Sequence, residues 1–316
     1  MSDRPRLTRR EALTAGLAAG AAALALRPSP AADDPGKALP LIMRPIPTSG
    51  ERLPVIGVGT NKYGVSSPDE VAARRAVLAR LPELGGSVVD TAPIYGLSES
   101  LIGEQVASIG NRDRLFLASK VMASDADAAK ASFEETLRRL KVPRIDLLQV
   151  HNLVGVDSVL PLLQEWKKTG KIRYYGVTTS SPGQHARMLE IMRRQPLDFI
   201  QVDYSIGNRL AADAVLPAAQ ERGIAVLLNE PLGGRRGGNA LTQVAGRMLP
   251  EWAADIDARS WAQFFLKYAI SHPAVTCAIP GTTSVAHLED NQLGGRGRVP
   301  DAALRKRMEQ FWDSKA

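Results

Sequence analysis

From Leu41 onward, short apolar runs rich in β-branched residues alternate with stretches whose apolar residues recur at helical spacing. The runs are continuously apolar, which predicts parallel strands buried on both faces. Eight strand–helix units of this kind predict an α/β fold, a (β/α)8 TIM barrel. The predicted strands span residues 55–60, 87–92, 115–121, 146–151, 172–178, 199–204, 225–230 and 276–281.

An open, doubly wound sheet is the alternative arrangement for such units. That fold is expected to carry the glycine pattern G-x-G-x-x-G between its first strand and first helix. The corresponding stretch here, GVGTNKYG at 57–64, does not fit the pattern. We therefore predict one barrel over residues 41–316. Residues 41–54, with turn residues at 48–50, are expected to form a β-hairpin that closes its bottom.

The N-terminal residues are expected to act as a targeting signal. Arg9 and Arg10 precede a short apolar run, Ala12–Leu26, which is poor in bulky aliphatic residues. This order is similar to twin-arginine export signals. We expect residues 1–32 to be a signal peptide recognised by the twin-arginine translocation machinery, residues 33–40 to be a linker, and the protein to be periplasmic or otherwise exported. A membrane anchor formed by an uncleaved signal and a disordered basic tail on a cytoplasmic protein are the alternatives.

Charge and cysteine content narrow the classes of function. The formal net charge is +7, and residues 1–31 contain five arginines against Asp3 and Glu11, which leaves +4 on the remainder. That remainder has no long run of basic residues interleaved with aromatics, so no nucleic-acid partner is expected. Cys277 is the only cysteine, so no disulfide can form within the chain. No metal is expected, and the oligomeric state stays open.

Polar residues end three consecutive predicted strands. These residues are Asp90, Lys120 and His151, and Tyr95 follows Asp90 by five positions. Because chemistry in such barrels gathers at the C-terminal ends of the strands, we expect the four side chains to meet. A tyrosine hydroxyl with a pKa near ~10 donates its proton poorly at neutral pH unless a nearby ammonium, here Lys120, favours the phenolate. Asp90 would balance the Lys120 charge, and His151 could bind a carbonyl oxygen or help to move the proton.

These residues resemble the aldo-keto reductase family from about Leu41 to the C-terminus. The family's Asp, Tyr, Lys and His fall on VVDTAPIYG, LASKV and LLQVHN. The resemblance implies a barrel that binds NADPH and reduces aldehydes or ketones with Tyr95 as general acid. It also implies cofactor contacts from Gly59, Thr60 and Gln201, and stacking of the nicotinamide ring on Tyr204.

Two segments depart from the family pattern. After the fifth strand the family commonly has Ser-Asn, whereas this chain has Thr178 and Thr179, whose hydroxyls replace only some of the bonds to the carboxamide. After the eighth strand, Gly281 and His287 stand where Lys or Arg usually binds the 2′-phosphate of NADPH, which should weaken discrimination for that phosphate. NADP(H) is favoured from the resemblance and NAD(H) is the alternative. The contacts that remain in this segment are Thr282, Ser284 and Asn291.

The loop NEPLGGRRGGN at 229–239 is a further candidate for cofactor binding. Its glycines let backbone N–H groups approach a pyrophosphate, and we expect contacts from Leu232, Gly233 and Arg235. A glycine-rich surface loop without a ligand is the alternative. Walls of the substrate pocket are expected to include Tyr63 and Asn152.

Three classes of function remain open. The favoured one is an NAD(P)H-dependent reductase of a small-molecule carbonyl. The second is a cofactor-binding sensor or accessory protein on the same fold with little turnover. The third is a (β/α)8 lyase or isomerase that uses Tyr and Lys for proton abstraction. Gln201 and Tyr204 favour the reductase over the lyase, and only turnover separates the reductase from the sensor.

Overall fold

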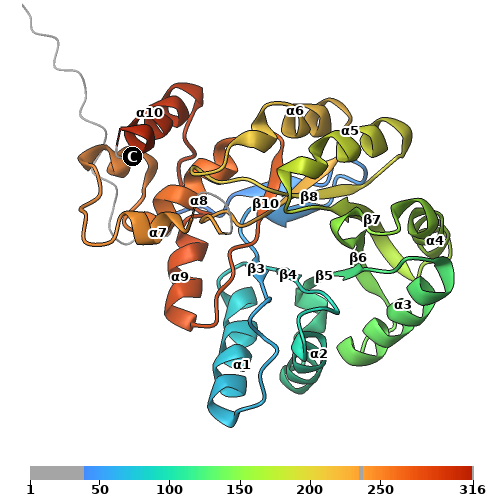
Figure 1. Cartoon of the computed structure of the whole chain (residues 1–316). Helices are drawn as coiled ribbons and strands as arrows, with labels where there is room; N and C mark the ends of the chain where they lie inside the picture. The colour runs from blue at the N-terminus through green and yellow to red at the C-terminus, as the bar shows by residue number, and fades with distance from the viewer. Residues whose placement is uncertain (1–38, 235–237, 315–316) are drawn as a thin grey trace, which may run out of the picture. The chain divides into compact units, whose positions relative to one another are not determined.

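Eight parallel strands form a barrel (Figure 1). The computed structural model describes residues 39–234 and 238–314. Neighbours in chain order pair in parallel. Bridges between Ile56 and Ala278 and between Gly59 and Gly281 join the first strand to the last. The predicted barrel is confirmed. Its strands are β3 (Val58–Gly59), β4 (Val88–Asp90), β5 (Phe116–Val121), β6 (Ile145–Val150), β7 (Ile172–Thr178), β8 (Phe199–Asp203), β9 (Ala225–Asn229) and β10 (Val275–Ala278).

Helices cover the outside of the barrel, and local sequence signals set where several of them begin. The Ser67 side chain accepts a hydrogen bond from the Glu70 backbone N–H at the start of α1, and Asp125 accepts one from Ala128 at the start of α3. Such caps pair donors that the first turn of a helix leaves free. The helices are α1 (Pro68–Glu83), α2 (Ser98–Ile109), α3 (Ala126–Leu140), α4 (Val156–Lys168), α5 (His185–Arg194), α6 (Val215–Glu221), α7 (Ala240–Gln243), α8 (Trp261–Ser271), α9 (Val285–Leu293) and α10 (Ala302–Asp313).

A β-hairpin closes the bottom of the barrel. Its strands β1 (Met43–Pro45) and β2 (Arg52–Pro54) pair in antiparallel fashion. Ile46 and Leu53 are buried in the same apolar cluster as Phe116, the first residue of β5. Because that cluster lies at the N-terminal ends of the barrel strands, the hairpin takes the place predicted for residues 41–54.

Successive residues of a strand alternate between the barrel interior and the layer beneath the helices. On β5, Phe116 and Ala118 belong to the interior cluster, whereas Leu117 and Val121 belong to the larger cluster between strands and helices. The same alternation directs Lys120 into the interior, above the apolar layer. The barrel interior therefore has a polar layer of side chains near its C-terminal end, which lies on a layer of apolar side chains.

The predicted signal peptide, residues 1–32, lies outside the described residues, as does most of the predicted linker. In the part of the chain that is described, no helix is long and apolar enough to span a membrane. Cys277, on β10, is a free thiol buried in the barrel interior.

Candidate active site

The C-terminal ends of the strands surround a cavity of about 840 Å³. Its wall includes all four residues of the predicted catalytic set: Asp90, Tyr95, Lys120 and His151. They lie at or just after the ends of β4, β5 and β6, and parallel neighbours end at the same rim of a barrel. The structure thus brings the set together. Other predicted site residues in the wall are Gly59, Thr60, Asn152, Thr178, Gln201, Leu232, Gly233 and Gly281.

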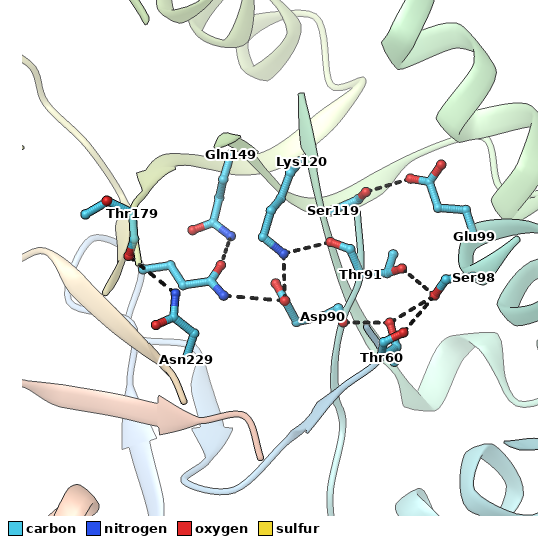
Figure 2. A network of polar contacts seen from close by, with 11 residues as sticks. Thr60, Asp90, Thr91, Ser98, Glu99, Ser119, Lys120, Gln149, Thr179 and Asn229 are labelled. Atoms are coloured by element: carbon cyan, nitrogen blue, oxygen red, sulfur yellow. Dashed lines mark hydrogen bonds and ion pairs between the residues drawn. The ribbon is translucent and has the colours of Figure 1, made fainter. Parts of the chain in front are cut away.

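Lys120 is the buried cation of this site. Its Nζ donates hydrogen bonds to Asp90 Oδ2 at 2.7 Å and to the Thr91 carbonyl oxygen at 2.8 Å (Figure 2). Only 1% of the residue is exposed. Burial alone would lower the pKa of Lys120, but Asp90 and Tyr95 outweigh it and raise that pKa above its usual value. The side chain therefore stays an ammonium across the physiological range.

The Tyr95 and His151 rings lie close to this ion pair, in the wall of the cavity. Lys120 Nζ lies 5.3 Å from the centroid of the Tyr95 ring. The Tyr95 and His151 rings are perpendicular, with centroids 6.2 Å apart. Tyr95 is half-buried and faces the cavity, and His151 Nδ1 is buried without a hydrogen-bond partner among the described residues. A tyrosine hydroxyl and a neutral imidazole beside one ammonium form a site for a polarised oxygen atom.

His151 is neutral in this environment. Burial, followed by the charge of Lys120, lowers its pKa from 6.5 to about 4. NMR of the imidazole should therefore show no protonation step near pH 6.5, and a midpoint there would contradict the described surroundings of the ring. The folded state binds fewer protons than the unfolded state in this interval, so His151 should reduce stability as the pH falls from 6.5 towards 4.

Hydrogen bonds between neighbouring loops hold the strand ends in register. Thr60 Oγ1 donates to the Asp90 carbonyl oxygen at 2.8 Å. Ser98 Oγ donates to the Thr60 carbonyl oxygen at 3.1 Å, and the Ser98 and Thr91 hydroxyls lie 2.9 Å apart (Figure 2). Since Lys120 also bonds to Thr91, this network ties the ammonium to the loops after β3 and β4.

Comparison with known proteins agrees with this geometry. The model of the aldo/keto reductase family matches residues 55–293. The chain is 32% identical over 248 residues to methylglyoxal reductase YeaE of Escherichia coli, covering 76% of this chain and 84% of the relative. The chain belongs to the aldo/keto reductase family. Family membership makes it an oxidoreductase of the carbonyl-reducing kind.

Solved aldo-keto reductases share the fold. One from Bacillus halodurans superposes with a TM-score of 0.72 at 24% identity, covering 86% of this chain and 96% of that one. An aldo/keto reductase from Klebsiella pneumoniae, solved with NADP and acetate, gives a TM-score of 0.69 at 24% identity, covering 83% and 93%.

Two aromatic residues of this aldo/keto reductase do not lie where the sequence analysis expected. Tyr63 is a fully buried core residue, which corrects its assignment to the wall of the substrate pocket. Tyr204 is 1% exposed and stacks on Tyr268 with ring centroids 5.6 Å apart, so its expected place beneath the nicotinamide ring is also corrected. The described wall of the cavity contains two aromatic rings, those of Tyr95 and His151.

The predicted cofactor segments of this family member are only partly in the cavity wall. Thr178 lines it, whereas Thr179 is buried with its hydroxyl accepting from the Ser181 backbone N–H at 2.9 Å. After β10, Gly281 lines the cavity. Arg235 lies outside the described residues. Three predicted contacts from the loop and helix after β10 are not among the residues that line the cavity: Thr282, Ser284 and Asn291.

Sequence reasoning missed several polar residues of the wall. Asn229, at the end of β9, lines the cavity, and its buried Oδ1 has no partner among the described residues. Asn61, Lys62 and Ser180 line it as well. Asn229 follows Ala225 and Leu227 at alternate positions of its strand, and both of these lie in the barrel interior. The two-residue period could have identified it.

Proposed function

We propose that the protein reduces an aldehyde or ketone to the alcohol with NADP(H) as cofactor and Tyr95 as general acid. The observation that carries the proposal is the placement of the buried Lys120 ammonium between Asp90 and Tyr95 in the cavity wall. An ion pair this deeply buried is costly to maintain for stability alone. Its contact with a cavity-facing tyrosine gives it a chemical use.

The cavity fits a nicotinamide nucleotide. Its volume of about 840 Å³ is within the range of cofactor sites. The side-chain amides of Asn229 and Gln201 lie in its wall and suit a carboxamide group. A side chain at Gly59 would place its Cβ 2.9 Å from the Ile279 carbonyl oxygen, so glycine lets the end of β3 lie directly against the backbone that follows β10 in this wall. The Klebsiella pneumoniae relative, which binds NADP, supports the same use here.

We assign the holding of the cofactor to the residues at the strand ends. Gln201, Asn229 and Thr178 would bind the nicotinamide end, and the backbone of 231–234 and of Gly281 would hold the phosphates. When bound, the nicotinamide supplies the hydride that the carbonyl carbon accepts.

The chain's own residues handle the proton and the oxygen. The Tyr95 hydroxyl donates its proton to the carbonyl oxygen, and the Lys120 ammonium stabilises the phenolate that remains. Asp90 keeps Lys120 charged and directed at the cavity. His151, being neutral, donates one hydrogen bond to the same oxygen and so orients the carbonyl.

Titration of the purified protein with each nucleotide, followed by fluorescence, tests the cofactor assignment. We expect saturable binding of both, with NADPH tighter than NADH. The preference should be modest, because the sequence after β10 has Gly281 and His287 where a cation usually binds the 2′-phosphate. Absence of binding by either nucleotide would contradict the proposal.

We further infer from the sequence that the protein is exported by the twin-arginine route. The support is the order of Arg9, Arg10 and the apolar run at 12–26. Cell fractionation of a variant with both arginines replaced by lysine should find the protein retained in the cytoplasm. Continued export of that variant would refute this route.

A further inference from the structure

Gln149 lies in the polar layer of the barrel interior, beside the predicted catalytic residues. It is the register partner of Lys120 on the neighbouring strand and is fully buried. Its Nε2 donates a hydrogen bond to Gln201 Oε1 at 2.8 Å, and Gln201 Nε2 donates to Asp90 Oδ2 at 3.4 Å (Figure 2). Two amides in series thus connect β6, through β8, to the carboxylate that pairs with Lys120.

Asp90 gives this series a direction: burial raises its pKa, but the paired Lys120 ammonium opposes that shift and favours the carboxylate. A carboxylate accepts hydrogen bonds only, so the Gln201 amide must turn its NH₂ group towards Asp90. Its oxygen then faces Gln149, which must donate. Reversing either amide would set oxygen against oxygen inside the barrel, where unpaired polar groups are costly. The orientation of each amide therefore follows from the network.

Among the described residues, Gln149 is the only one that donates a hydrogen bond to Gln201 Oε1. Asp90 reaches only one end of the Gln201 amide, at the long distance of 3.4 Å. The bond to the other end is shorter, at 2.8 Å, and comes from a side chain with no exposed surface. Gln149 Oε1 is buried without a partner among the described residues, so the bond that Nε2 donates to Gln201 is the interaction that offsets the burial of this amide.

We propose that Gln149 is a positioning residue for the reaction. It holds the Gln201 amide with its NH₂ group towards Asp90, which keeps the Asp90–Lys120 pair in place beneath Tyr95 and sets the Gln201 amide for the carboxamide of the cofactor. The catalytic consequence rests on the proposed function. The positioning itself concerns the protein's own side chains and can be observed without cofactor.

The first measurement is made on the protein free of nucleotide. The side-chain NH₂ signal of Gln201 is assigned by its loss in Gln201→Met, and its ¹⁵N order parameter is compared between the wild type and Gln149→Met. Methionine has a similar length but no donor. We expect a value typical of a rigid group in the wild type and a clear fall towards values typical of flexible groups in the variant. An unchanged value would overturn the proposal.

The second measurement is a double-mutant cycle on carbonyl reduction. Gln149→Met should lower kcat/KM on the order of tenfold, because it leaves the Gln201 oxygen buried and unpaired. In the Gln201→Met background the same change should have almost no further effect, since Gln149 acts through Gln201. Losses that multiply in the double variant would overturn the proposal.

Leu147→Val provides the structural control. Leu147 precedes Gln149 by two positions and lies in the same barrel interior. Its truncation should lower the thermal stability while leaving the Gln201 order parameter and kcat/KM near wild type. If the wild type reduces no carbonyl, the proposed function fails, and the order parameter of Gln201 still decides whether Gln149 positions it.

Discussion

Tyr95→Phe should lower kcat for carbonyl reduction by about 10²–10⁴-fold, the contribution of a well-placed general acid. The substitution removes the only proton donor that the proposal assigns to the carbonyl oxygen. It leaves the ring, the Asp90–Lys120 pair and the rest of the cavity wall in place. Nucleotide affinity, measured by fluorescence titration, should therefore stay close to wild type.

Tyr63→Phe is the matched control for this prediction. Tyr63 is two positions from Asn61 of the cavity wall, but its ring lies in the apolar core and its hydroxyl has no hydrogen-bond partner among the described residues. Removing that hydroxyl should leave kcat unchanged and stability the same or higher. Full activity of Tyr95→Phe, or loss of activity in Tyr63→Phe, would contradict the assignment of the general acid.

Lys120→Met should abolish turnover and also destabilise the fold by about 3–5 kcal/mol, because it leaves the Asp90 carboxylate buried without its counter-ion. The loss should shrink as the pH falls. An unpaired buried carboxylate has a raised pKa, so the folded variant binds a proton that the unfolded chain releases, and protonation stabilises it. Chemical denaturation at several pH values measures this dependence.

The double variant Lys120→Met with Asp90→Leu separates stability from catalysis. Replacing both charges with apolar groups of similar size should restore most of the free energy of unfolding, since no buried charge remains. Turnover should stay lost. A single Lys120→Met variant as stable as wild type would show that the ion pair is not buried as described.

The strand pattern predicted which side chains come together at the C-terminal end of the barrel. Asp90, Lys120 and His151 lie at the ends of three consecutive strands or within one residue of them, and parallel pairing in a barrel leaves such residues only one rim on which to meet. The alternation along β8 also explains why the prediction for Tyr204 was wrong. Gln201 points into the barrel, so Tyr204, an odd number of positions later, must face the helices, where it packs in the outer core.

Other parts of the site could not be predicted from a repeating pattern in the sequence. Tyr63 lies in a loop after β3, and nothing in GVGTNKYG distinguishes a ring that turns into the core from one that faces the cavity. Gln149 stands two positions after Leu147, which gives its inward direction, but its partner comes from a strand 52 residues away. Such a contact becomes visible only once β6 and β8 are placed around one barrel.

The most direct test of the account is a single turnover. The purified protein, loaded with one equivalent of NADPH, is mixed with a panel of aldehydes and ketones, and loss of reduced nicotinamide is followed together with the alcohol formed. A carbonyl reductase should oxidise the bound NADPH and produce alcohol in equal amount with at least one member of the panel. Bound NADPH that stays reduced with every carbonyl would contradict the account and favour a nucleotide-binding sensor on the same barrel.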